Sequence, residues 1–390
     1  MTVDLTNGVT AATGFLAAGV TAGLKATGKP DLALVVNQGP SFAAAGVFTS
    51  NRVFAAPVGW SRQAVKDGCL KAVVLNSGGA NACTGEAGRQ DAAQTAAWVA
   101  ELIGADPADI GVCSTGLIGE RLPMAKIEAG VRAAHAALAP DGGLAAATAI
   151  MTTDTKPKQA CYRSPAGWTV GGMAKGAGML APALATMLVT LTTDALLDST
   201  ELDPALWAAT SQSFDRADSD GCMSTNDTVL LLASGASGVT PDPDEFADAL
   251  TAVCVALARQ LIADAEGAEH EVTVTVTGAA TEEDALEVAR AVARSNLFKC
   301  AIAGNDPNWG RVLAAVGTTA AAFDADALDV AFNGVAVFRD GAPGEPRSAV
   351  DLHPRQVDVA INLHAGHHEA AIWTNDLTHG YVSENADYSS

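Results

Sequence analysis

Two kinds of hydrophobic periodicity run through this chain, and together they limit it to a fold that contains both helices and strands. Apolar residues recur at helical spacing in five segments, 89–103, 123–138, 204–214, 244–265 and 282–297. Short runs rich in Val, Ile, Leu and Thr predict strands at 32–37, 72–76, 168–170, 187–191, 228–233, 271–277, 357–363 and 370–374. Because the two kinds alternate only loosely, we expect a mixed α/β or α+β layered fold.

The length of the chain allows two or three domains. It has 390 residues, of which 49% are apolar, and a domain of this kind commonly takes roughly 150 residues. An alternating strand ends near 278–281, where the acidic start of a helix follows. We therefore expect a core domain at 1–278, a smaller α/β domain at 279–375 and a tail at 376–390.

The charge of the chain argues against nucleic acid and membrane partners. Lys and Arg total 23 against 44 Asp and Glu, a net charge of −21, so the surface repels phosphate groups and anionic lipids. The apolar run 179–191 contains Pro182 and is shorter than the ~20 residues of a spanning helix. Seven scattered cysteines without a C-x-x-C pair are typical of reduced thiols, and no secretory signal is visible. We expect a cytoplasmic protein.

Several residues could suggest other sites, but each has a simpler explanation. His364-Ala-Gly-His-His368 has no partner Cys or carboxylate at ligand spacing, so an exposed loop is favoured over a metal site. Cys83 and Cys113 lie in glycine-rich loops without a neighbouring His and are expected to be structural. Turn, cap or packing roles are expected for Asp218, Asp220, Asp227, Asp306 and Trp309.

Glycine clusters mark four loops, and each lies beside hydroxyl or amide residues. They are 76–81, 113–119, 171–178 and 304–310. None has the spacing G-x-x-x-x-G-K-[ST], so a phosphate-binding loop is not predicted. Taken one at a time, each cluster is explained by a tight turn.

The segment Lys175-Gly-Ala-Gly-Met-Leu-Ala-Pro-Ala-Leu-Ala-Thr186 is the most informative one. It is a glycine-rich loop that bears a lysine and leads into a strand beginning with a hydroxyl residue, as self-cleavage requires. A freed Thr186 would carry both a hydroxyl nucleophile and an α-amine, whose pKa of about 8 lets it act as a base. From residue types alone, β-propensity explains this threonine equally well, and Thr190, Thr192 and Thr193 are equal candidates.

The same segment resembles the self-cleavage motif of the ornithine acetyltransferase family, the bifunctional glutamate N-acetyltransferases of arginine biosynthesis. Further motifs of that family follow in order over essentially the whole chain: Ser114-Thr-Gly-Leu-Ile-Gly119, Met151-Thr-Thr-Asp154, Ser224-Thr-Asn-Asp227, Glu266-Gly267, Asp306-Pro-Asn-Trp-Gly-Arg311 and a tail that starts at Asp376. The resemblance implies a layered sandwich of the self-processing N-terminal-nucleophile kind.

The resemblance also implies a role for individual residues. The chain is expected to cleave between Ala185 and Thr186 into an α chain (1–185) and a β chain (186–390), and Thr186 then carries the acetyl group from N-acetylornithine to glutamate. Thr115 and Gly116 stabilise the oxyanion. The amino-acid site is lined, with the tail returning to it, by Thr152, Lys175, Thr186, Glu266, Asn385 and Ser390. A lysine suits a carboxylate and a glutamate suits an ammonium group.

No metal or organic cofactor is expected, whereas acetyl-CoA is left open as a second acetyl donor. The family implies a heterotetramer of two α and two β chains. In one respect this sequence departs from the family, whose Glu-Gly pair is usually followed by a small residue and Thr-Lys; here Ala268 is followed by Glu269 and His270. This departure bears on substrate preference more than on cleavage.

Two other classes of function remain to be separated from the transferase. One is a self-processed N-terminal-nucleophile amidohydrolase or aminopeptidase, in which water accepts the acyl group. The other is an assembly protein in which cleavage only matures an oligomer. The amino-acid-binding motifs favour the transferase over both.

Overall fold

The computed structural model describes residues 1–179 and 187–387, so the expected cleavage residues Ala185 and Thr186, and Ser390, lie outside the described part. The chain forms two compact units. Unit 1 comprises residues 1–215 and 222–261, and unit 2 comprises residues 216–221 and 262–390. The boundary expected at 278–281 lies inside unit 2, where β10 (Glu271–Ala279) is hydrogen-bonded between two strands of that unit's sheet.

A four-stranded sheet of unit 1 has the order β1-β2-β4-β5. Its strands are β1 (Phe15–Val20), β2 (Leu32–Asn37), β4 (Ala72–Ser77) and β5 (Ile110–Thr115). β4 and β5 are parallel, so their carboxyl ends lie at the same edge. The other two pairings are antiparallel.

A five-stranded sheet completes unit 1 and has the order β3-β9-β8-β7-β6. Its strands are β3 (Ala43–Phe48), β6 (Lys158–Arg163), β7 (Thr169–Lys175), β8 (Leu188–Thr193) and β9 (Thr228–Ala233). β8 pairs parallel with β9 and antiparallel with β7. The strand after the expected cleavage point therefore lies inside the sheet and has a neighbour on each side.

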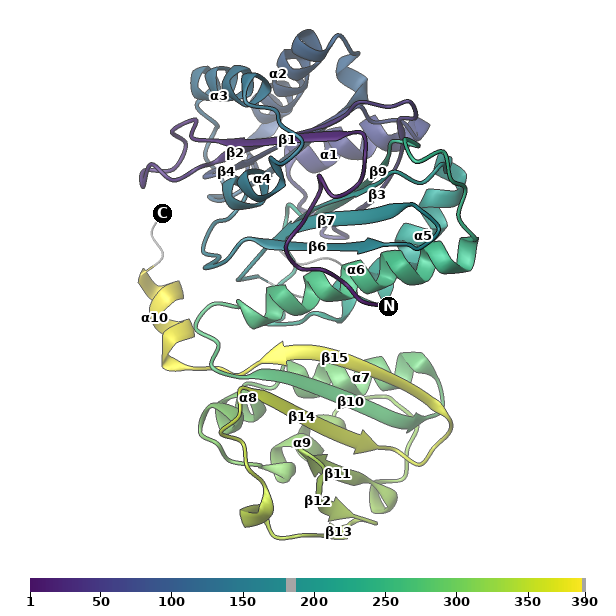
Figure 1. Ribbon diagram of the computed structural model, residues 1–390. Helices are drawn as coiled ribbons and strands as arrows, with labels where there is room; N and C mark the ends of the chain where they lie inside the picture. Colours follow the sequence, from purple (N-terminus) through teal and green to yellow (C-terminus); the bar gives the residue numbers. More distant parts are fainter. Residues whose placement is uncertain (180–186, 388–390) are drawn as a thin grey trace. The chain divides into compact units, whose positions relative to one another are not determined.

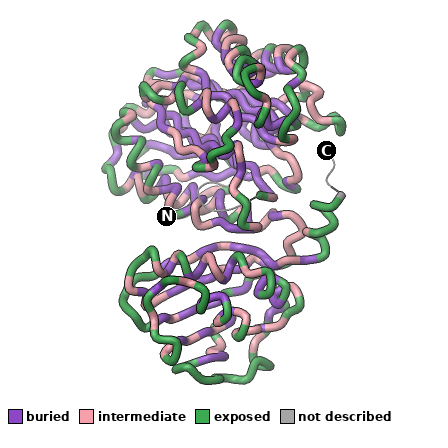
Figure 2. The backbone as a smooth tube through the Cα atoms, turned by 180° about the vertical axis from the view of Figure 1, so that it is seen from behind, coloured by how far each residue is buried: buried purple, intermediate pink, exposed green. Residues whose placement is uncertain are grey.

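The two sheets pack face to face between outer helices, which makes unit 1 a sandwich of four layers (Figure 1). The alternation of β2 shows how the sequence produces this arrangement. Ala33 and Val35 join the core between the sheets, whereas Leu32 and Leu34 face the other way, against helices α2 (Gly85–Ile103) and α3 (Met124–Ala136). Every residue of β2 is buried, as expected of a strand covered on both faces. Figure 2 shows this buried centre.

The described residues of unit 1 form six α-helices. They are α1 (Ala56–Ala64), α2 (Gly85–Ile103), α3 (Met124–Ala136), α4 (Gly143–Ala149), α5 (Ser199–Ser211) and α6 (Pro243–Ala263). α5 and α6 lie on the outer side of the five-stranded sheet (Figure 1). By length and composition α6 could cross a membrane, but half of its most apolar window is buried in the protein. A helix that covers a sheet passes the same test.

Unit 2 contains one mixed sheet of six strands, in the order β13-β12-β11-β14-β10-β15. The strands besides β10 are β11 (Asp329–Phe332), β12 (Val335–Arg339), β13 (Ala342–Pro343), β14 (Gln356–Asn362) and β15 (His368–Asn375). Its helices are α7 (Glu282–Ala293), α8 (Asn296–Ala303), α9 (Trp309–Val316) and α10 (His379–Asp387). Side chains from α7, α8 and α9 share one apolar core with the sheet.

The expected fold class of mixed α and β layers is confirmed. All five expected helices and all eight expected strands are present, with ends that differ by a few residues. The largest shifts are of five residues: β7 ends at Lys175 rather than at Val170, and α5 begins at Ser199 rather than at Pro204. Asp198 and Glu201 form a reciprocal capping box there, which sets the start of the helix one turn earlier.

Candidate active site

Two of the glycine clusters, 76–81 and 113–119, are hydrogen-bonded to each other at the carboxyl edge of the four-stranded sheet. β5 ends at Thr115, and its carbonyl oxygen accepts hydrogen bonds from the N–H groups of Gly78 (2.9 Å) and Gly79 (3.0 Å), in the loop after β4. Gly116 has a φ of 129°, and a Cβ there would lie 2.5 Å from the nitrogen of Gly79. This close approach of two backbones explains why a glycine follows Thr115.

A lysine from the other sheet reaches this edge. Lys175 is the last residue of β7, and its Nζ lies 3.5 Å from Oγ1 of Thr115. Its side chain is only 2% exposed. The structure therefore brings together two residues that the sequence places in one site, although 60 residues separate them.

A buried carboxylate, Asp154, connects the expected residues on this side of the site. Its Oδ2 accepts from the backbone N–H of Thr152 (2.9 Å) and lies 3.9 Å from Nζ of Lys175. Its Oδ1 accepts from Gly176 (2.7 Å) and from Nζ of Lys158 (2.6 Å). Thr152 and Lys175, both expected to bind the amino acid, thus share a single anchor.

The electrostatics of this cluster keep Asp154 ionised. Burial would raise the pKa of its carboxyl group, but the charges of Lys175 and Lys158 and the hydrogen bonds outweigh it, so the pKa lies well below the usual 3.8. Lys25 is a further lysine whose charge interacts with Lys175. Burial lowers the pKa of Lys25 to about 8, against the opposing effect of Asp31.

A second buried carboxyl group, Asp227, binds Met187, the first described residue after the expected cleavage point. Its Oδ1 accepts from the backbone N–H of Met187 at 3.0 Å. Burial raises the pKa of Asp227 well above 3.8, although the bond from Met187 acts in the opposite direction. The backbone N–H groups of Gly176 and Met187, which precede and follow residues 177–186, thus each donate to a buried carboxyl group.

The loop that contains Asp227 is also bound to the glycine clusters. Nδ2 of Asn226 donates to the carbonyl oxygens of Ala80 (2.7 Å) and Ser114 (2.8 Å). Oγ of Ser114 in turn donates to Oδ1 of Asn76 at 2.6 Å. These bonds fix the positions of the loops after β4 and β5, and a rigid backbone is what an oxyanion site requires.

Two expected site residues meet in unit 2. Nδ2 of Asn385, on α10, donates to Oε2 of Glu266 at 3.0 Å. Both side chains are polar and exposed at their contact. Within unit 1 the structure brings together Thr115, Thr152 and Lys175. Within unit 2 it brings together Glu266 and Asn385.

Sequence reasoning missed three of the buried residues in this arrangement. Asp227 was expected to be a turn or cap residue, but it is fully buried and holds Met187. Asp154 is the last residue of the motif Met151-Thr-Thr-Asp154, which does not indicate a role for it, and no motif contains Lys158. A carboxyl group inside a motif rich in threonine was the available signal for Asp154; burial of Lys158 leaves no trace in the sequence.

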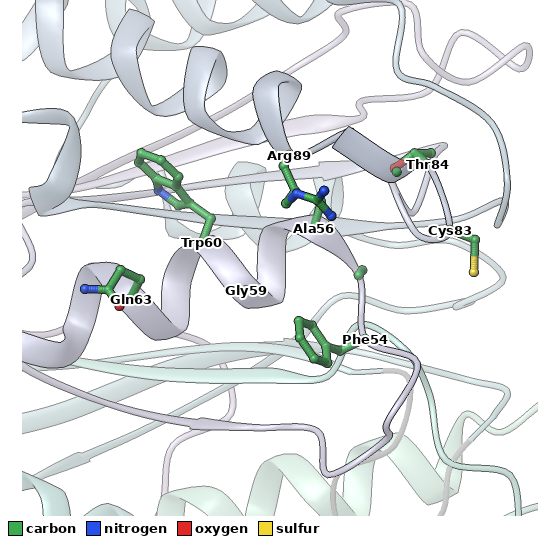
Figure 3. Close-up of a pocket in the computed structure, with 10 residues that line it drawn as sticks. Phe54, Ala56, Gly59, Trp60, Gln63, Cys83, Thr84 and Arg89 are labelled. Atoms are coloured by element: carbon green, nitrogen blue, oxygen red, sulfur yellow. The ribbon is translucent and has the colours of Figure 1, made fainter. Parts of the chain in front are cut away.

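A separate surface pocket of unit 1 contains none of the expected site residues. Its volume is about 370 Å³, and it is lined mainly by α1, by the turn at Cys83 and Thr84 and by Arg89 (Figure 3). Within residues 1–179 and 187–387, no group of three His, Cys, Asp or Glu side chains could hold a metal ion.

Comparison with known proteins decides the family. The ArgJ family model matches residues 16–390. The arginine biosynthesis bifunctional protein ArgJ of Streptomyces avermitilis is 63% identical over 382 residues, which cover 98% of this chain and all of that protein. The protein of the same name from Mycobacterium leprae is 57% identical, covering 98% of this chain and 96% of its own. The chain belongs to the ArgJ family.

Solved structures of this family are also similar. The ornithine acetyltransferase of Mycobacterium tuberculosis, complexed with ornithine, is 53% identical and covers 48% of this chain and 100% of its own, with a TM-score of 0.46. The ArgJ protein of Bacillus halodurans is 36% identical and covers 51% of this chain and 97% of its own, with a TM-score of 0.48.

The family predicted from the sequence motifs is therefore confirmed. With it the assignment of the chain to the acyltransferases of arginine biosynthesis is confirmed over that of a self-processed amidohydrolase or aminopeptidase. The roles of individual ArgJ residues remain predictions.

Proposed function

We propose that the chain cleaves itself between Ala185 and Thr186 and then transfers an acetyl group from N-acetylornithine to glutamate. The observation that carries this proposal is the meeting of Lys175 and Thr115 at 3.5 Å, beside glycine loops held by Asn226. This arrangement places a cation next to a rigid backbone turn, which suits a carboxylate substrate whose acyl carbonyl becomes an oxyanion.

Cleavage begins with attack of the Thr186 hydroxyl oxygen on the carbonyl carbon of Ala185. The C–N bond breaks, the amine of Thr186 takes a proton, and water hydrolyses the ester that results. The described residues on either side of the cleavage point support this step, because the backbone N–H groups of Gly176 and Met187 each donate to a buried carboxyl group, which fixes their positions.

Acetyl transfer then proceeds in two half-reactions. The Thr186 hydroxyl attacks the acetyl carbonyl of N-acetylornithine while its own α-amine accepts the proton, and Thr115 and Gly116 stabilise the oxyanion. Ornithine leaves with that proton. The α-amino nitrogen of glutamate then attacks the acetyl carbonyl, the ester C–O bond to Thr186 breaks, the threonine oxygen takes the proton that the nitrogen releases, and N-acetylglutamate leaves. In both substrates Lys175 binds the α-carboxylate; Glu266, with Asn385, binds the ornithine ammonium group, and Thr152 and Ser390 complete the site.

The two fragments are proposed to remain associated. β3, β6 and β7 come from residues 1–185, whereas β8 and β9 come from 186–390, and all five strands form one sheet in the order β3-β9-β8-β7-β6. Separation would break both the β3–β9 and the β7–β8 pairings. The assembly proposed is a heterotetramer of two α and two β chains. Because all seven cysteines are free, we place it in the cytoplasm.

A second activity, acetylation of glutamate by acetyl-CoA through the same acetyl-threonine, is also proposed. It is supported by the word "bifunctional" in the names of relatives up to 63% identical. No tightly bound cofactor takes part in either reaction. An acetyl-CoA assay with glutamate in the absence of N-acetylornithine tests this activity separately.

The test of the main proposal starts with intact mass and N-terminal sequencing. Two chains, the second starting Thr-Met-Leu-Val, are expected, together with transfer of labelled acetyl from N-acetylornithine to glutamate. Thr186→Ala should yield one uncut chain without transfer. Acetyl exchange by an uncut chain would overturn the mechanism, and hydrolysis far exceeding transfer would favour the amidohydrolase alternative.

A further inference from the structure

The turn at residues 266–270 is held to the tail at residues 376–385 by three side chains of the tail. Oδ1 of Asp376 accepts from the backbone N–H groups of Glu269 (3.0 Å) and His270 (3.1 Å). Oγ1 of Thr378 donates to the carbonyl oxygen of Gly267 at 2.6 Å. The third contact is the bond between Asn385 and Glu266. We call this set of contacts the tail clamp.

The backbones of the tail clamp fit closely. Gly267 has a φ of 62°, and a Cβ there would lie 2.1 Å from the nitrogen of Tyr381 and 2.4 Å from the carbonyl carbon of Gly380. No other residue type could occupy this position without moving α10. The orientation of α10, and with it that of Asn385, therefore depends on how the turn is held.

His270 fixes that turn from the inside. Its ring is buried, with 6% of the residue exposed. Nδ1 lies 2.7 Å from Oδ2 of Asp376, and Nε2 lies 3.0 Å from the carbonyl oxygen of Leu352. Both ring nitrogens thus face acceptor oxygens, one on the side chain of Asp376 and one on the backbone of Leu352. The ring therefore connects the tail to a second segment of unit 2.

We propose that His270 is a positioning residue for amino-acid binding, which acts by holding the tail clamp and through it the Glu266–Asn385 pair. This inference rests on the proposed roles of Glu266 and Asn385. It assigns a role to the residue at which the sequence departs from its family. His270 itself lies in the buried interior of the clamp and touches neither substrate nor reacting atoms.

Other charged groups around the clamp do not replace the ring. Arg355 binds the same turn from outside, through the carbonyl oxygens of Ala268 (3.2 Å) and Glu269 (3.4 Å), and pairs with Glu271 at 2.9 Å. Lys299 interacts electrostatically with Asp376 but donates to Thr374 and Asn375. Asp351 pairs with the exposed His353. Among the side chains named in this paragraph, only the ring of His270 hydrogen-bonds to the side chain of Asp376.

The test compares processed wild-type enzyme with His270→Ala, His270→Asn and the control His353→Ala. His353 is a matched control because it is also paired with an aspartate, at 2.8 Å, but its side chain is 84% exposed. His270→Ala is expected to raise the KM for N-acetylornithine about ten-fold, the effect of one well-oriented hydrogen bond, with kcat changed less than about two-fold. His270→Asn should recover part of the loss, because its amide can still donate to Asp376.

A second readout does not depend on activity. In hydrogen exchange, the amides of α10 should exchange faster in His270→Asn than in the wild type and in His353→Ala. Unchanged KM in His270→Ala together with unchanged exchange in His270→Asn overturns the inference. If His270→Ala does not fold, the KM for N-acetylornithine and the hydrogen exchange of α10 in His270→Asn test the inference instead. If the wild-type enzyme does not transfer acetyl groups, the proposed function is refuted. The hydrogen exchange of α10 would still show whether His270 holds the tail clamp.

Discussion

Nζ of Lys175, at the end of β7, lies 3.5 Å from Oγ1 of Thr115, at the end of β5, and the two strands belong to different sheets. The contact thus joins the two layers at one edge of the sandwich. It places Lys175, the expected carboxylate-binding residue, beside Thr115 of the expected oxyanion site. The buried carboxylate of Asp154 holds the ammonium group of Lys175 in position.

Removal of the charge of Lys175 should weaken amino-acid binding. Lys175→Met is expected to lower kcat/KM for both N-acetylornithine and glutamate about 100-fold, since a buried charge-assisted contact to the carboxylate is lost. Lys66→Met, at an exposed position of unit 1, is the matched control and should leave kcat/KM unchanged. Equal kinetics for the two variants would show that Lys175 does not bind the substrate.

Asp154→Asn should destabilise the protein at neutral pH by about 3 kcal/mol, because the two buried ammonium groups lose a shared anionic partner. The folded-state pKa of Asp154 is lowered below 3.8, so its stabilisation is fully present above about pH 4 and lost as pH falls through the folded-state pKa. Urea unfolding of both proteins between pH 8 and 3 measures this. A difference that shrinks as pH rises would contradict the assignment.

Asp227→Asn should show the opposite dependence on pH. Burial raises the folded-state pKa of Asp227, so above about pH 4 the unfolded chain loses a proton that the folded protein keeps, and wild-type stability falls as pH rises. Asparagine does not titrate, so its Tm relative to the wild type should increase from pH 4 to pH 8. Asp248→Asn, at an exposed position, provides the comparison. A Tm difference independent of pH would place an ionised carboxylate at Asp227.

The cut protein should behave as one particle. Native size-exclusion chromatography is expected to give a single peak that contains both fragments, whereas denaturing electrophoresis separates them. The reason is the arrangement β3-β9-β8-β7-β6, in which strands of the two fragments pair at two places. A native peak that holds one fragment alone would refute this prediction.

Much of the fold could be predicted from the sequence because the segments with a clear pattern of apolar residues are the ones that the structure buries as helices and strands. Leu32–Asn37 reads as an apolar run and is a fully buried strand. The structure adds β1 and β3, whose sequences FLAAGV and AAAGVF are rich in Ala and Gly. Such residues have little strand preference of their own; these strands form because β2 and β9 offer them hydrogen-bonding partners.

The candidate site was only partly predictable, for a related reason. Motifs identify Thr115 and Lys175, but their contact depends on how two sheets pack. The roles of Asp154 and Asp227 depend on burial, which turns an ordinary carboxyl group into an anchor for a backbone. No spacing rule connects Asp227 with Met187, since the bond crosses 40 residues.

The interleaved five-stranded sheet also constrains how such a protein can be made. Expressed as separate genes, the fragments would expose unpaired strand edges, with the β8–β9 pair open on both sides, and such edges promote aggregation. A single reading frame supplies the two halves in equal number and lets each strand find its neighbour while still covalently tethered. In the proposed mechanism, the peptide bond between Ala185 and Thr186 therefore first tethers the two halves while their strands pair, and we expect folding to precede cleavage.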